Sequence, residues 1–388
     1  QVKTLIQLLR ELINKGNTVV AIEHDQAFIK ASDYLIEMGP ESGKNGGQVI
    51  YQGPTAAIKN HPETTTFKSQ FEAVAILPKK INSAGQLFGL KGARKNNLKA
   101  IDVSFQSNRI TAITGVSGSG KSSLIKDVIY ESISKKRPIG CQSIYGFEIF
   151  DEVFLIDQKP IAIHALSSPA SIIGILDLFQ AEFAKTEKAK ANKRKKGEFS
   201  YQSKNGRCQV CKGYGEAKTS MDFMSDIWIK CETCEGSRYH LDISNYKLKG
   251  KDAKNYNIGE ILQLTAAEIN TLFANSNINE RLQTLIDLGL GHLQLGQAGN
   301  TLSGGEAQRL KLAQAIISKN GQNLYLFDEP SSGLHQLDLL GLIKVFENLI
   351  DLGHTIIFIE HNPTLISCAN ERIQLGPSSG ENGGEIVG

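Results

Sequence analysis

A glycine-rich segment from Gly115 to Ser122 carries the residue types that bind a chain of phosphates. It follows a short β-branched stretch, residues 110–114, and leads into an apolar stretch that begins at Ser123. A strand, a G-x-x-x-x-G-K-S loop and a helix form the setting in which backbone N–H groups and a helix N-terminus surround a phosphate. We therefore predict a nucleotide site here, with Lys121 on the β- and γ-phosphates of ATP.

The expected ligands of ATP and Mg²⁺ lie in this loop and at the end of a later strand. The Ser122 hydroxyl is expected to coordinate Mg²⁺, and Asp328, after the apolar residues 323–327, to hold the ion mainly through water. Glu329 is expected to orient and polarise the attacking water. The predicted nucleotide-binding residues in these segments are Gly115, Ser117, Gly118, Gly120, Lys121, Ser122, Ser123 and Asp328.

Two further polar residues follow predicted strands. His361 comes after residues 355–359 and is expected to bond the γ-phosphate and to sense its loss. Gln158 comes after residues 153–156 and is expected to contact Mg²⁺ and the attacking water. A lone histidine at a strand end is usually structural, so the prediction for His361 depends on its position behind the acidic strand.

Four of the six cysteines form two CxxC pairs, Cys208 with Cys211 and Cys231 with Cys234. Four thiolates at this spacing predict a closed tetrahedral Zn²⁺ site, structural rather than catalytic because no position stays open for water. Two redox-active pairs are the alternative. The residues between the pairs, 221–229, are predicted to form a hairpin that the metal holds.

A Ser-Gly-Gly turn at Ser303, Gly304 and Gly305 opens a predicted helix between the phosphate loop and the acidic strand. This order of phosphate loop, Ser-Gly-Gly turn, acidic strand and histidine resembles the layout of an ABC-type ATPase core, which is an α/β fold. In such cores the turn caps the γ-phosphate of ATP bound to an opposing core. The resemblance therefore implies a pair of cores that closes on ATP.

A long internal repeat relates residues 18–53 to residues 355–388, and at an offset of 337 positions 18–51 align with 355–388 without a gap. His24 is the counterpart of His361 and would be the switch residue of another site. A period of this length indicates a duplicated domain rather than a solenoid. We expect the chain to contain the tail of a first core, whose phosphate loop, signature and acidic strand would lie upstream of Gln1.

The predicted architecture is an α/β, ABC-type core with a zinc-binding, partly helical insertion, preceded by that tail. The expected boundaries are 1–53 for the tail, 54–84 for a connector, 85–170 for the first part of the second core, 171–290 for the insertion, and 291–388 for the remainder. The chain is 40% hydrophobic and 21% charged, an ordinary balance for a soluble globular protein. No apolar run approaches the ~20 residues that span a bilayer.

The net charge of +3 is too small to indicate a polyanionic partner. Residues 185–196, however, contain seven positive charges and one negative. A solvated surface and a phosphate-contacting patch are both open interpretations. The candidates for phosphate contacts are Lys193, Arg194, Lys195 and Lys196.

An ABC-type core with a CxxC insertion ahead of its signature resembles the UvrA family, the damage-recognition subunits of the bacterial excinuclease. The resemblance rests on residues 115–122, 208–238, 300–312, 328–335 and 375–388 and covers nearly the whole chain as the C-terminal portion of a longer protein. It implies a cytoplasmic homodimer that hydrolyses ATP, binds damaged double-stranded DNA and loads a UvrB-like helicase, with no membrane partner.

One segment departs from the family pattern. The family has an arginine-containing stretch where this chain reads 161–172, and Ile163 and Leu166 occupy the arginine positions. This difference favours an alternative, a UvrA-like paralogue tied to drug or antibiotic resistance without a general repair role. A third reading, the ATPase subunit of a transporter, is disfavoured by the zinc insertion.

Overall fold

The structure is a computed structural model of the 388-residue chain. It describes residues 2–23, 26–39, 46–64, 66–68, 77–80, 85–157, 164–221, 224–317, 321–332, 334 and 336–388. The chain divides into a smaller unit, Gln1–Ile76 with His335–Leu337, and a larger unit, Leu77–Leu334 with Asp338–Gly388. Among the described residues, no helix has the length and apolar character needed to cross a membrane.

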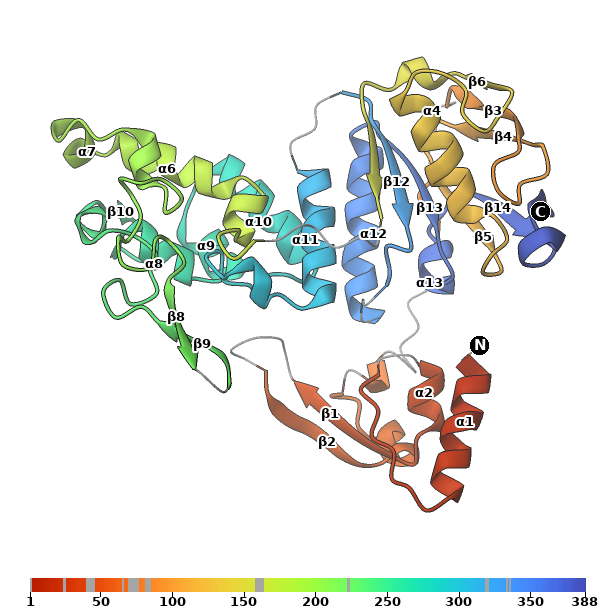
Figure 1. Cartoon of the computed structure of the whole chain (residues 1–388), viewed down its shortest axis with the longest axis horizontal. Coiled ribbons are helices and arrows are strands. Elements are labelled where there is room, and N and C mark those ends of the chain that lie inside the picture. Colours follow the sequence, from red (N-terminus) through yellow and green to blue (C-terminus); the bar gives the residue numbers. More distant parts are fainter. Residues whose placement is uncertain are drawn as a thin grey trace. The chain divides into compact units, whose positions relative to one another are not determined.

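A six-stranded sheet with the order β15-β14-β5-β13-β12-β7 forms the centre of the larger unit (Figure 1). The five strands from β7 to β14 run parallel to one another, and β15 is antiparallel to β14. Every residue of β12 and β13 is buried, which explains why both strands are apolar apart from Asp328 at the end of β12 and Thr355 at the start of β13. The strands are β5 (Ile110–Gly115), β7 (Val153–Ile156), β12 (Leu324–Asp328), β13 (Thr355–Ile359), β14 (Glu371–Gly376) and β15 (Glu385–Ile386).

A second, antiparallel sheet with the order β4-β3-β6 shares its apolar core with the first. Its strands are β3 (Leu87–Ala93), β4 (Ile101–Gln106) and β6 (Ser143–Tyr145), and the 3-10 turn η4 (Phe147–Ile149) follows. The helix after the phosphate loop, η3 (Ser123–Tyr130), has π-helical geometry and continues as α4 (Glu131–Ser134). Two more helices accompany the last strands, α12 (Gln336–Asp351) and α13 (Pro363–Ile366).

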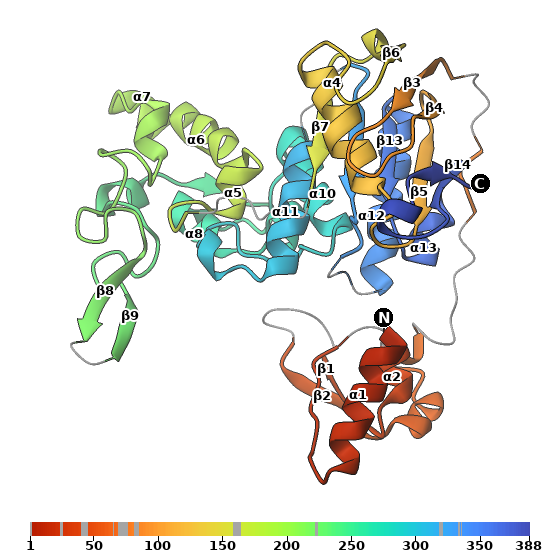
Figure 2. The same cartoon turned by 45° about the vertical axis from the view of Figure 1, so that its right-hand side comes forward.

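The insertion between β7 and β12 is partly helical, and in both views it lies on the α11 side of the sheet, away from β14 (Figure 1, Figure 2). Side-chain capping boxes begin four of its helices, α5, α8, α9 and α11, and satisfy N–H groups that these short helices leave unpaired. Its elements are α5 (Pro169–Ile172), α6 (Ile175–Lys185), α7 (Glu187–Ala191), η5 (Lys196–Phe199), β8 (Glu216–Met221), β9 (Met224–Lys230), η6 (Leu241–Asn245), β10 (Leu248–Lys249), β11 (Asn255–Tyr256), α8 (Ile258–Gln263), α9 (Ala266–Leu272), α10 (Ser276–Asp287), η7 (Gly299–Thr301) and α11 (Gly304–Ile316).

The smaller unit contains α1 (Val2–Asn14), α2 (Gln26–Ala31), the hairpin β1 (Tyr34–Gly39) and β2 (Gln48–Pro54), and η2 (Thr55–Asn60). It repeats the end of the larger unit closely. Met38 pairs with Val49 in its hairpin, and Leu375 pairs with Ile386 in β14–β15, so both register pairs are related by the offset of 337.

One part of the repeat is not a strand. Residues 18–22 correspond to β13 but have no regular structure. The physical reason is the lack of neighbours: β13 bonds to β12 on one side and to β5 on the other. Among the described residues of the smaller unit, β1 and β2 are the only strands, and a lone strand has no partner for its backbone groups.

Candidate nucleotide site and cysteine cluster

Three neighbouring strands of the central sheet end at the same edge, because β5, β13 and β12 are parallel. β5 leads into the phosphate loop, β12 ends at Asp328, and Glu360 follows β13. Polar residues that are far apart in the sequence therefore meet at one edge, which is where ligands bind in open α/β sheets.

Lys121 lies inside the phosphate loop and is only 5% exposed. Its Nζ donates to the carbonyl oxygens of Gly115 and Val116, each at 2.8 Å. Burial lowers the pKa of Lys121, and the negative charges of Glu329 and Asp328 oppose that change. The loop thus already surrounds the Lys121 ammonium group, and its carbonyls occupy the place around Nζ that phosphate oxygens are expected to take.

Two loop glycines are required by the backbone. Gly115 has φ of +136° and Gly120 has φ of +102°, a region that other residues rarely adopt. A Cβ at Gly115 would collide with the backbone oxygen of Leu375, and one at Gly120 would lie 2.8 Å from the side chain of Leu98. The sequence signal for the loop therefore has a steric basis.

The segment after β14 braces the loop from outside, which the sequence did not reveal. Asn97 Nδ2 donates to the carbonyl oxygens of Gly118 at 2.9 Å and Gly380 at 3.2 Å. The N–H of Gly384 donates to the carbonyl of Ser119 at 3.1 Å. Residues more than 260 positions apart thus fix the loop's outer wall.

The acidic strand end approaches both the helix after the phosphate loop and His361, the second residue after β13. Lys126 Nζ is 2.6 Å from Asp328 Oδ2, and His361 Nε2 is 3.5 Å from Glu329 Oε1. Glu329 has φ of +51°, and its N–H donates to the carbonyl of Ile359 at 3.0 Å. Strained backbone of this kind persists where the surrounding structure holds it, and it is common at functional sites.

Glu360 is a buried carboxylate that sequence reasoning passed over. Its oxygens accept N–H donors from Ser331 at 2.9 Å, His361 at 2.6 Å and Asn362 at 2.8 Å. Bonds from N–H groups to a carboxylate are strong, so they tie the loop after β12 to the one after β13. The available signal was an acidic residue that directly follows a buried five-residue strand and precedes His361.

The residues at this edge fit Mg²⁺ and ATP. The Ser122 hydroxyl is exposed and the Asp328 carboxylate lies at the strand end, and both are the hard oxygen ligands that Mg²⁺ prefers. Ser117 and Gly118 are exposed on the loop, and Ser123 is half-buried. A bound ATP would supply the phosphoryl group to be transferred. Gln158 and His24 lie outside the described residues.

The Ser-Gly-Gly turn begins α11 within the larger unit. Ser303 Oγ accepts the N–H of Glu306 at 3.3 Å, and the Glu306 carboxylate accepts the N–H of Ser303 at 2.9 Å. His292 Nε2 lies 2.9 Å from Glu306, and this hydrogen bond is the main reason that the pKa of Glu306 falls to about 2. Ser303 and Gly304 are exposed, and a Cβ on Gly304 would meet no atom within 4 Å. The turn therefore presents an open surface.

The four cysteines of the two CxxC pairs come together in one cluster. The Sγ atoms of Cys208, Cys211, Cys231 and Cys234 all lie within 4.8 Å of one another, and all four residues are buried. Burial raises the pKa of the Cys234 thiol to about 12. For Cys231 burial is outweighed by hydrogen bonds, first from the N–H of Cys234 and then from that of Thr233 and from the neighbouring thiols, and its pKa falls to about 7. A single set of four soft ligands fits Zn²⁺ better than two separate redox pairs.

The hairpin predicted between the cysteine pairs is present. β8 and β9 pair antiparallel with Glu216 opposite Lys230, so the strands leave and re-enter the cluster at one end. The N–H of Gly215 donates to Cys211 Sγ at 3.3 Å, a contact that orients the thiol.

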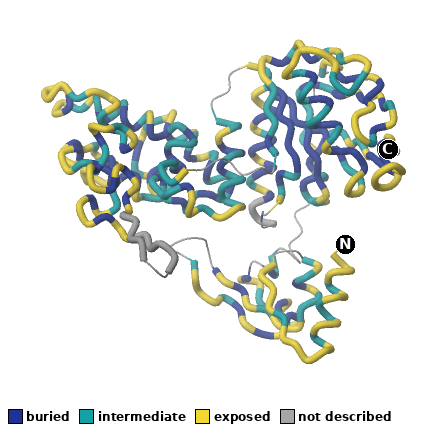
Figure 3. The backbone as a smooth tube through the Cα atoms, in the orientation of Figure 1, coloured by how far each residue is buried: buried dark blue, intermediate teal, exposed yellow. Residues whose placement is uncertain are grey.

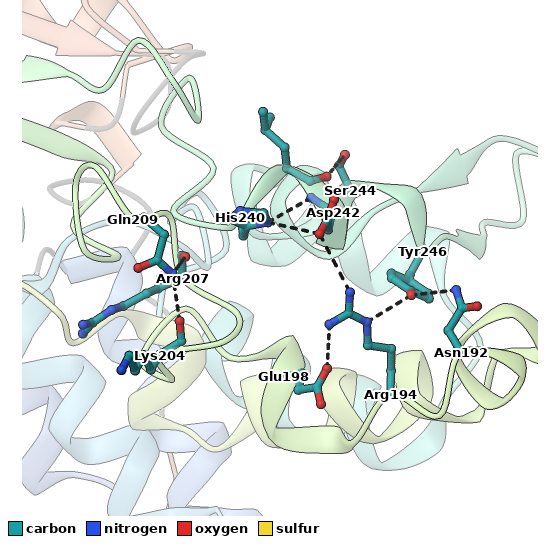
Figure 4. A network of polar contacts seen from close by, with 11 residues as sticks. Asn192, Arg194, Glu198, Lys204, Arg207, Gln209, His240, Asp242, Ser244 and Tyr246 are labelled. Carbon is teal, nitrogen blue, oxygen red and sulfur yellow. Dashed lines mark hydrogen bonds and ion pairs between the residues drawn. The ribbon is translucent and has the colours of Figure 1, made fainter.

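The basic run is partly engaged within the insertion. Arg194 donates to Glu198 at 2.8 Å and to the Tyr246 hydroxyl at 3.2 Å, and it approaches Asp242 (Figure 4). Glu198 is the main reason that the pKa of Arg194 is raised. Lys196 pairs with Asp177 at 2.6 Å, whereas Lys193 and Lys195 are exposed. Of the four candidates for phosphate contacts, Arg194 and Lys196 thus already have partners within the chain.

The phosphate loop after β5, the acidic end of β12 and the capped Ser-Gly-Gly turn define an ABC-type ATPase fold. The chain belongs to the family described as ABC transporter, because the sequence model of that family matches residues 98–332.

Among known proteins, the chain is similar to UvrABC system protein A. The protein from Clostridium acetobutylicum is 40% identical over 393 residues, which cover 99% of this chain and 41% of the relative. The protein from Staphylococcus epidermidis is 39% identical with the same coverage. The crystal structure of UvrA2 from Deinococcus radiodurans superposes with a TM-score of 0.88 at 34% identity and covers 100% of this chain and 47% of that one.

These similarities confirm the resemblance to UvrA proteins and the predicted fold class. The chain spans about two fifths of the length of the curated relatives it matches.

Proposed function

We propose that the larger unit binds Mg²⁺ and ATP at the phosphate loop and hydrolyses ATP. The observation that carries the proposal is the convergence of Lys121, Asp328 and the Glu329–His361 contact at the ends of three adjacent strands. Lys121 would exchange its two loop carbonyls for phosphate oxygens. Bound Mg²⁺ would neutralise charge on the phosphates.

Glu329 would orient and polarise a water molecule whose oxygen forms a bond to the γ-phosphorus. The bond from that phosphorus to the β,γ-bridging oxygen breaks, the protons of the water remain on the inorganic phosphate, and ADP and phosphate leave. His361 would contact the γ-phosphate and report its loss to Glu329, 3.5 Å away. Glu360 would hold the loop after β12 against the loop after β13 through its three N–H bonds. Gln158 would contact Mg²⁺ and the attacking water.

A nucleotide-binding assay with ATP-hydrolysis measurement tests these roles. Lys121→Ala should remove ATP binding, whereas Glu329→Gln should bind ATP and lower turnover by about 100-fold or more. Normal ATP affinity in Lys121→Ala would show that the phosphate-loop assignment is wrong. Unchanged turnover in Glu329→Gln would remove its catalytic role.

We also propose that the exposed Ser303–Gly305 turn caps ATP of an opposing core. The open space beside Gly304 supports a contact outside the chain. Residues 1–53 are proposed to be the tail of a first core, 54–84 its connector, and 85–170, 171–290 and 291–388 the successive parts of the second core. Support comes from the register that the two hairpins share.

The similarity to UvrABC system protein A supports a wider proposal: a dimeric, ATP-dependent sensor of damaged duplex DNA that loads a helicase during excision repair. Zn²⁺ at the cysteine cluster would fix the insertion, and Lys193 and Lys195 would add sequence-independent phosphate contacts. A resistance-type paralogue is the second candidate, favoured by Leu166 in the divergent segment.

Binding of damaged and undamaged duplexes over a salt series, with and without ATP, separates the two candidates. A damage preference that changes with ATP, together with a steep salt slope, supports the repair sensor. ATP hydrolysis without duplex binding supports the paralogue.

A further inference from the structure

The carboxylate expected to hold Mg²⁺ already has a cationic partner. Lys126 Nζ lies 2.6 Å from Asp328 Oδ2, and the two side chains are 27% and 10% exposed. The pair joins the helix after the phosphate loop to the carboxyl end of β12. Because both groups are largely removed from water, salt screens this pair less than it screens an ion pair at the surface.

Lys121 is a second ammonium group in the field of the same carboxylates. The charges of Glu329 and Asp328 act on it, while its own hydrogen bonds go to two loop carbonyls. Two lysines and two carboxylates sum to no net charge. A divalent cation that binds Asp328 therefore meets a carboxylate that an ammonium group already neutralises.

Lys126 also shares one helix with an expected metal ligand. Ser122 is the residue immediately before η3, and Lys126 lies within it. The π-helical geometry of η3 is rare in proteins and occurs frequently at functional sites. The expected ligand and the cation opposite it are thus positioned by the same unusual element.

We propose that Lys126 competes with Mg²⁺ for Asp328 and so sets the Mg²⁺ concentration at which nucleotide binds. Its N–H donors use the carboxylate oxygens that the water molecules of a bound Mg²⁺ would use. Like charges repel, so Lys126 withdraws from Asp328 as the metal is loaded, and its flexible four-carbon stem permits that movement. The proposal rests on the nucleotide site proposed above and adds a determinant of its metal dependence.

The test is a Mg²⁺ titration of the binding of a fluorescent ATP analogue to the full chain. We expect Lys126→Met to lower the half-saturating Mg²⁺ concentration about three- to tenfold, the scale of a partly buried ion pair. Lys126→Arg keeps the charge and should stay within about twofold of wild type. Lys135→Met is the matched control, because Lys135 pairs with Glu131 on α4 and should leave the midpoint unchanged.

An unchanged or higher midpoint in Lys126→Met overturns the proposal, and so does an equal fall in Lys135→Met. If thermal unfolding shows that Lys126→Met does not fold, Lys126→Gln takes its place with the same expected shift. Failure of the nucleotide site itself has a different signature: the wild-type chain would bind no analogue at any Mg²⁺ concentration, and both proposals would fall together.

Discussion

The smaller and larger units contain the same pattern of apolar residues in two different environments. Ile22 is fully exposed, whereas its counterpart Ile359 is 1% exposed, and Leu8 is 52% exposed against 3% for Val345. The contrast is visible along the backbone, where the central strands of the larger unit are buried and α1 is mostly exposed (Figure 3). Apolar side chains become a core only where neighbouring strands and helices cover them.

Some elements of the repeat form in both units, whereas others form only where the rest of the sheet is present. α1 ends at Asn14 and α12 at Asp351, and the hairpins share their register, so these elements form in both environments. The counterpart of β13 does not form a strand, because a central strand depends on partners along both edges. The exposed apolar surface of the smaller unit is the kind that marks an interaction site.

The largest expected effect comes from the difference between the hairpin of the insertion, β8–β9, and the hairpin of the smaller unit, β1–β2. β8–β9 is anchored by the cysteine cluster, whereas β1–β2 has no such anchor among the described residues. Cys208→Ser should lower the zinc content and destabilise the insertion by about 5 kcal/mol or more, since metal binding contributes directly to folding. Elemental analysis and limited proteolysis measure both effects. Cys141→Ser is the control, and retention of one zinc per chain in Cys208→Ser would mean that the ligand set is wrong.

A matched pair of isoleucine substitutions tests the comparison most directly. Ile359→Ala removes a buried side chain from a central strand and should cost about 2–5 kcal/mol in the free energy of unfolding. Ile22→Ala, at the equivalent position, should change it by less than about 0.5 kcal/mol. Urea unfolding followed by circular dichroism measures both. Equal costs would show that Ile22 is covered in solution.

The smallest expected effect depends on pH. The pKa of Glu306 is lowered to about 2, mainly by the hydrogen bond from His292, so this group stabilises the fold above pH ~4.5 and loses that contribution as pH falls toward 2. Solvent screening limits the effect to about 1 kcal/mol. Glu306→Gln should flatten this part of the acid unfolding curve. Asp33→Asn, which breaks an exposed pair with Arg10, should leave the curve as it is, and a similar change in both would remove the distinction.

Local motifs made most of the site predictable. The phosphate loop, the Ser-Gly-Gly turn and the cysteine pairs are contiguous or closely spaced, and their glycines and thiols have few alternative uses. The apolar runs of β12 and β13 identified buried parallel strands for the same reason. The roles of Glu329, His361 and Ser303 stay predictions.

The remaining features depend on contacts between distant segments. Lys126 reaches Asp328 across 202 positions, and nothing in its neighbourhood distinguishes it from a surface lysine. Glu360 directly precedes His361, whose residue type drew the functional prediction, and the three N–H donors to Glu360 are known only from the fold. The π geometry of η3 and the missing strand at 18–22 are likewise decided by packing, which sequence patterns do not encode.

The shared register of the two hairpins has a consequence for refolding. β14 bonds to β5, and β1, whose pairs Met38–Val49 and Gly39–Gln48 match the two β14–β15 pairs at the offset of 337, lies much closer to β5 along the chain. Closing the shorter loop costs less entropy, so a refolding chain meets the β1–β2 hairpin at that strand edge first. We therefore expect the β1–β2 hairpin to compete with β14 for this edge during refolding, a kinetic trap of the kind that internal duplication creates.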